Sequence, residues 1–194
     1  VTARDRLGVA AFSGGYRAAA FALIARSLLR EGDAAGALDA ANESLRCEGL
    51  QLDALLVKAI ALRGKPGRDA FLDGQLSRFP LDHALRYERT GVEGLKASVR
   101  NELPHETYLE LGSWYEETGL VDDAKAIFRL ALPNPEAEIR LAFLEGRAPA
   151  LGGPVAGVFP FRRESRPALE AAAASDVGWK ASYLCAVLLG FLRA

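Results

Sequence analysis

The sequence contains no methionine, two cysteines, two histidines and no excess of either charge. Lysine plus arginine number 24 and aspartate plus glutamate 25, so the net charge is −1. This balance argues against a nucleic-acid binder, which normally carries a marked basic excess. Cys47 and Cys185 form no CxxC pair and fall in predicted helices, so we expect two buried thiols rather than a disulfide. A reducing, cytoplasmic compartment fits this cysteine usage.

Long apolar runs are also absent. The longest near the C-terminus covers residues 181–192, short of the roughly 20 residues that span a bilayer. The other uncharged run, residues 148–161, contains three prolines and three glycines. We therefore expect no membrane segment, and no signal peptide is visible. Because the chain begins with Val1 and lacks methionine, we expect a fragment of a longer protein.

The motifs of common catalytic and metal sites are missing. There is no HExxH, no paired CxxC and no GxSxG elbow, and Ser13-Gly14-Gly15 lacks the lysine of a phosphate-binding loop. His83 and His105 each stand at the start of a predicted helix, where a surface or capping role is expected. Adjacent Glu116 and Glu117 project about 100° apart on a helix and cannot share a substrate atom. We predict no catalytic, cofactor or metal site, and no enzyme activity.

The strongest periodicity lies in residues 105–131. A first helical stripe comprises Tyr108, Leu111, Gly112 and Tyr115, and a second comprises Ala124, Ile127, Phe128 and Ala131. Gly119 between them suits the left-handed residue that follows a helix end. The pattern predicts a helical hairpin whose small residues, Gly112 and Ala124, let the two helices pack closely.

A second hairpin is predicted near residues 18–51. Its first helix carries the stripe Phe21, Ile24, Ala25 and Leu28, Gly32-Asp33 forms the turn, and its second helix carries Ala37, Ala41 and Leu45. Residues 1–15 are predicted to be a poorly structured lead-in. Further short helices are predicted at 69–78, at 81–89 and 92–101 on either side of Thr90-Gly91, at 137–145, at 165–174 and at 179–192.

The spacing of both hairpins resembles the tetratricopeptide repeat, a helical hairpin of about 34 residues with the pattern W-x2-L-G-x2-Y. The resemblance implies an all-α fold in which antiparallel hairpins stack as a right-handed solenoid, one domain over 1–194. The best repeats are 18–51 and 105–138. They start 87 residues apart, which is not a multiple of 34, so we expect a partly degenerate solenoid.

Four short patterns carry a more specific resemblance: Pro80–Glu88, Asn101–Glu110, Phe159–Glu164 and Trp179–Tyr183. They are similar to the helical tail of large bacterial proteins that carry a domain of unknown function, whose front half resembles a carbohydrate-active β-sandwich. The resemblance implies a non-catalytic scaffold or protein-interaction module of a larger bacterial protein. The alternative is an accessory domain of a carbohydrate-processing enzyme whose catalytic part lies elsewhere. A small-molecule-sensing array is a third interpretation, without supporting residues.

In the repeat family, the outward positions of each first helix line a concave groove. The resemblance maps these positions to Ala22, Arg26 and Leu29, and to Leu109, Ser113 and Glu116. The family's carboxylate clamp for chaperone tails needs lysines and asparagines there, so that partner is not expected. Arg26, Arg30 and Arg63 are candidates for a basic patch that binds an acidic ligand, although scattered arginines are usually solvated.

The expected partner is a protein or the missing part of the same polypeptide, without nucleic acid or membrane. The predicted helix at 179–192 is apolar almost all round and needs covering, so a homodimer through this helix is a further expectation. Trp114 and Trp179 are expected to be packing residues.

Overall fold

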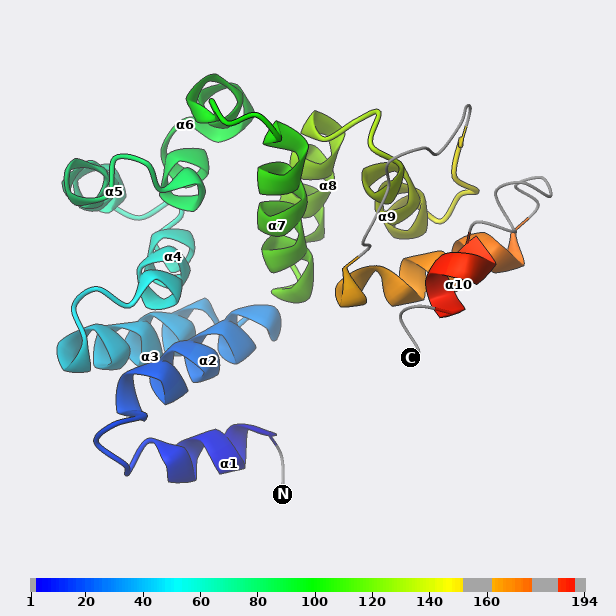
Figure 1. The fold of residues 1–194 in the computed structure, drawn as a ribbon. Helices are drawn as coiled ribbons and strands as arrows, with labels where there is room; N and C mark the ends of the chain where they lie inside the picture. Colours follow the sequence, from blue (N-terminus) through cyan, green and yellow to red (C-terminus); the bar gives the residue numbers. More distant parts are fainter. Residues whose placement is uncertain (1–2, 152–161, 176–184, 191–194) are drawn as a thin grey trace. The chain divides into compact units, whose positions relative to one another are not determined.

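The computed structural model describes residues 3–151, 162–175 and 185–190 (Figure 1). Every regular element in those residues is helical, with ten α-helices, one 3-10 turn and a helical stretch at 185–190. The predicted all-α class is confirmed for this part of the chain. None of its helices combines the length and apolar character that crossing a bilayer requires. The chain divides into two compact units: unit 1 comprises Val1–Val99 and Glu117–Leu120, and unit 2 comprises Arg100–Glu116 and Val121–Ala194.

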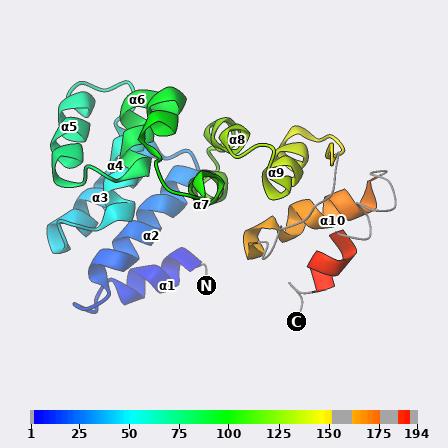
Figure 2. The ribbon, with the colours of Figure 1, turned by 45° about the horizontal axis from the view of Figure 1, so that its top comes forward.

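Unit 1 contains the hairpin predicted near 18–51. Helices α2 (Arg17–Arg30) and α3 (Ala34–Cys47) lie side by side and are joined by a three-residue turn (Figures 1 and 2). Gly32 in that turn has φ 82°, the left-handed region that glycine adopts at little cost. Asp33 then caps α3 by accepting a hydrogen bond from the Gly36 N–H at 2.9 Å. The Ser44 hydroxyl donates to the Ala18 carbonyl at 2.7 Å and ties the two helices together.

The buried face of α2 differs from the predicted stripe. Ala22, Ala25 and Leu29 are buried, whereas Phe21 and Leu28 are only half-buried. Helix α2 packs against α1, α3 and α4, so helices cover it on more than one side. Two of its groove positions, Ala22 and Leu29, therefore lie in the core of unit 1.

The N-terminal segment forms a helix where a poorly structured lead-in was predicted. Alanine, arginine and leucine favour helix in α1 (Ala3–Ala10), and Arg4 pairs with Glu31 of the α2–α3 turn. No residue of α1 is buried. Val9, Phe12 and Tyr16, at its end and in the following turn, are 72%, 93% and 69% exposed.

Helix α4 (Leu52–Ala61) is the most buried helix of unit 1, with seven of its ten residues in the core. It packs against α3, α5 (Arg68–Arg78) and α6 (His83–Ser98). Helix α6 is broken at Gly91, whose φ of 68° and ψ of −162° lie outside the helical region. This break confirms the two short helices predicted on either side of Thr90-Gly91.

Unit 2 contains most of the second predicted hairpin, α7 (Pro104–Glu117) and α8 (Val121–Leu130). Gly119 has φ 84° in the turn, as its position after a helix predicted. A Cβ atom at Gly112 would collide with the Phe128 ring, so the close approach of α7 and α8 depends on the missing side chain. Helix α9 (Pro135–Glu145) follows and is capped by Asn134, which accepts hydrogen bonds from the Glu136 and Ala137 N–H groups.

The end of the described chain packs within unit 2. A 3-10 turn, η1 (Arg163–Ser165), leads into α10 (Arg166–Ala174). Residues 185–190 bury Cys185, Leu188 and Leu189 in an apolar cluster with Ile139 of α9 and with α10. This covers one face of the helix predicted at 179–192. Trp179 and the other residues of that prediction at 179–184 and 191–192 lie outside the described residues.

The prediction of two buried thiols is wrong for one of them. Cys47 is exposed and Cys185 is buried, and neither forms a disulfide. Cys47 is the last residue of α3, where the chain turns into the exposed segment 48–50. Burial raises the pKa of the Cys185 thiol above its ordinary value.

Candidate functional site

The most polar part of the interior of unit 1 is a cluster around Glu88 on α6. Its side chain is 0% exposed and lies between two arginines. Arg63, in the turn after α4, donates from Nε to Oε2 at 2.9 Å and from Nη2 to Oε1. Arg68, the first residue of α5, donates from Nη2 to Oε2 at 2.7 Å and to the Glu88 carbonyl at 2.6 Å. One carboxylate on α6 thus joins the turn after α4 to the start of α5.

A second cluster centres on Arg140 of α9, whose side chain is 1% exposed. Its Nε donates to Glu116 Oε2 at 2.9 Å, and its Nη1 donates to the Ser113 hydroxyl. The guanidinium lies over the Phe128 ring, 4.8 Å from the centroid, in a cation–π contact. The Ser113 hydroxyl in turn donates to the Leu109 carbonyl at 2.7 Å. The cluster joins α7, α8 and α9 around one buried cation.

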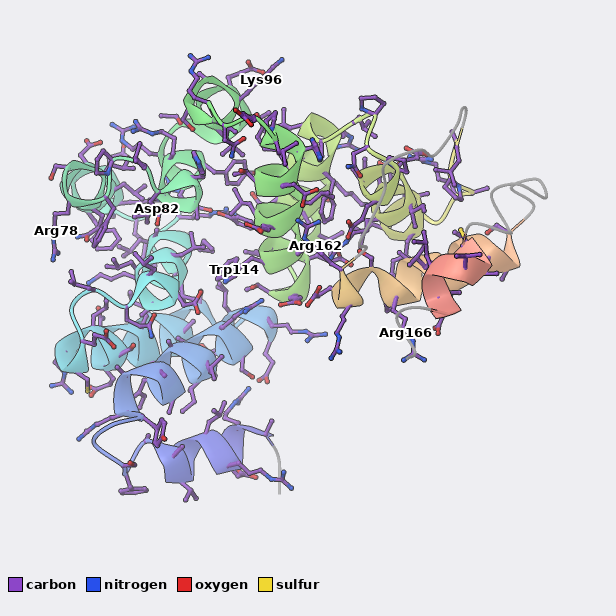
Figure 3. The ribbon with its side chains drawn as sticks, in the orientation of Figure 1. Arg78, Asp82, Lys96, Trp114, Arg162 and Arg166 are labelled. Atoms are coloured by element: carbon purple, nitrogen blue, oxygen red, sulfur yellow. The ribbon has the colours of Figure 1, made fainter. Side chains whose placement is uncertain are left out.

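The third cluster surrounds Glu136, which is 4% exposed at the start of α9. Arg162, labelled in Figure 3, donates from Nη1 to Glu136 Oε2 at 3.1 Å and from Nη2 to Glu106 Oε2 at 2.6 Å. The Ser165 hydroxyl also donates to the Glu136 carboxylate. These bonds attach η1, the turn before α10, to α7 and α9.

All three clusters follow one physical rule. A charge removed from water loses several kcal/mol of hydration, which an opposite charge and additional hydrogen bonds must replace. Glu88, Glu136 and Arg140 each receive both inside their own unit. These buried charged groups therefore bind one another, and each guanidinium orients a carboxylate on a neighbouring helix.

The six candidate groove contacts fall into different surroundings. Ser113 and Glu116 belong to the Arg140 cluster, and Leu109 beside them is completely buried. Leu109 and Ser113 are buried, whereas the Glu116 side chain keeps 19% of its surface exposed. Their role in a groove stays a prediction.

Of the three arginines of the predicted basic patch, Arg26 and Arg30 both lie against residues 117–119. Arg26 donates to Glu117 Oε2 at 2.5 Å and to the Thr118 hydroxyl at 3.1 Å, while Arg63 belongs to the Glu88 cluster. Arg30 is exposed, and its Cγ lies 3.4 Å from where a Cβ at Gly119 would stand. An acidic ligand at Arg26 or Arg63 would compete with an internal carboxylate, and its binding stays a prediction.

The clusters include residues that sequence reasoning missed: Arg68, Glu88, Glu136, Arg140 and Arg162. One signal was available, since Arg140 interrupts the apolar run from Ile139 to Leu144. No such signal identifies the oppositely charged partners, because Arg162, for example, lies 56 residues from Glu106 in the sequence. Helical spacing relates residues three or four apart and cannot identify such pairs.

The surface of unit 2 has a hollow of about 360 Å³, lined by Pro104, His105 and residues 130–134. Leu132 in this lining is 43% exposed, and Leu103, the residue before Pro104 in the sequence, is 57% exposed. His105 Nε2 lies 3.4 Å from Glu106 Oε1. Across the described residues, histidine, cysteine, aspartate and glutamate side chains form no group of three suited to a metal ion. The hollow is mainly apolar.

Trp114, labelled in Figure 3, is half-buried on α7. Its ring packs edge-on against that of Tyr115, with ring centroids 5.3 Å apart. The packing role expected of Trp114 stays a prediction.

Comparisons with protein-family models, with curated proteins and with solved structures give no match to this chain.

Proposed function

We propose that the chain is a non-catalytic, tetratricopeptide-like scaffold and protein-interaction module of a larger bacterial protein. The observation that carries the proposal is the likeness of its two hairpins. In each, a first helix of 14 residues is followed by a three-residue turn with glycine at the centre. Those glycines, Gly32 and Gly119, have φ of 82° and 84°. Two stretches 87 residues apart thus form the same kind of helical hairpin.

Equivalent positions within the hairpins support a repeat. Ala37 and Ala124, 87 residues apart, are both 0% exposed in the second helices. The pair Ala25 and Ala41 in the first hairpin corresponds to Gly112 and Phe128 in the second. There, glycine makes room for the larger ring. A compensating change of size of this kind keeps the separation of two helices constant.

The use of buried charge also favours a scaffold. Repeat units cannot bury their apolar faces alone and gain stability from neighbouring helices. The Glu88 and Arg140 clusters each join three successive helices, and the Glu136 cluster joins the turn before α10 to α7 and α9. Their charges hold elements together. We propose a protein, or another part of the same polypeptide, as the partner.

Photo-crosslinking in the native host tests this function. A benzophenone amino acid replaces Phe12, or Leu132 beside the hollow, and the control position is the exposed Asp69 of α5. We expect one defined protein, or another part of the same polypeptide, to crosslink at an apolar position and not at Asp69. The partner is then purified and titrated against the chain by calorimetry.

Equal crosslinking at all three positions, or no heat of binding with the purified partner, would contradict the interaction module. A crosslinked partner that hydrolyses polysaccharide, with kinetics that change when the chain is added, would instead favour the accessory domain of a carbohydrate-processing enzyme.

A further inference from the structure

We draw no further inference here: the strongest candidate, the exposed apolar side chains of Val9, Phe12 and Tyr16 at the end of α1 and in the turn into α2, carries no proposal because nothing in the structure shows what covers them.

Discussion

At the scale of single residues, the stability of this protein depends on a few buried charges with neighbours of opposite sign. Glu88 is the clearest case, because its side chain is fully buried and two arginines bind it. The arginines are 36% and 19% exposed, so water can still reach part of each cation. Removing the carboxylate is therefore less damaging than leaving a wholly buried charge unpaired.

We expect Glu88→Ala to lower the free energy of unfolding by about 3 kcal/mol, the lower end of the range for breaking a buried ion pair. Glu88→Gln keeps an acceptor for one arginine and should cost less. Urea denaturation followed by circular dichroism measures both changes. The control is Glu43→Gln, which removes the surface pair with Arg46 and should change the midpoint much less. Equal shifts for Glu88→Gln and the control would show that the buried cluster is not stabilising.

The two cysteines should differ in reactivity. Cys47 is exposed, while Cys185 is buried and its pKa is raised by that burial, so less of it is thiolate at pH 8. Ellman's reagent should modify one thiol rapidly in the folded protein and the second only on unfolding. Cys47→Ser should remove the fast phase and leave the slow one. A fast phase that survives this substitution would place Cys185 within reach of solvent.

At the scale of elements, glycines fix how the helices turn and how closely they pack. Gly32 and Gly119 end two helices in the left-handed conformation, and Gly91 breaks α6. Gly112 has a different role, because it is helical and its missing side chain admits the Phe128 ring. The α7–α8 packing therefore needs a small residue on one helix and a large one on the other.

Gly112→Ala should destabilise the protein by about 1–3 kcal/mol, the usual cost of overpacking a core. Gly74→Ala is the matched control, since Gly74 is also helical and a Cβ there meets nothing within 4 Å. That substitution should instead stabilise α5 by about 0.5–1 kcal/mol, because it reduces the freedom of the unfolded chain. Thermal unfolding measures both. Adding Phe128→Leu to Gly112→Ala should recover part of the loss, and no recovery would mean that the ring is not the obstacle.

At the scale of the whole molecule, the chain has two compact units, each with its own buried charge clusters. In unit 2, Leu188 is 1% exposed and packs with Cys185 and Leu189 against α9 and α10. These three side chains are already buried by contacts within one copy of the chain. A homodimer through the C-terminal helix would have to use its other faces.

Leu188→Ala should therefore cost about 2–5 kcal/mol of stability, as for other buried leucines, without changing the mass in solution. Light scattering over a concentration series, for the wild type and this variant, gives the mass, and urea denaturation gives the stability. A wild-type dimer that the substitution converts into a folded monomer of unchanged stability would show that Leu188 belongs to an interface between copies.

The sequence by itself determined most of the helices, though not α1, and also the glycine turns and the close approach at Gly112, because backbone preference and helical periodicity act within a few residues. It also pointed to Ser113 and Glu116, though not to their binding of Arg140. Only the tertiary structure decided that Glu88 and Arg140 are buried, that helices cover α2 on more than one side, and that Cys47 is exposed. Burial depends on neighbours tens of residues away in the chain. Oppositely charged side chains that far apart come into contact only when whole helices pack.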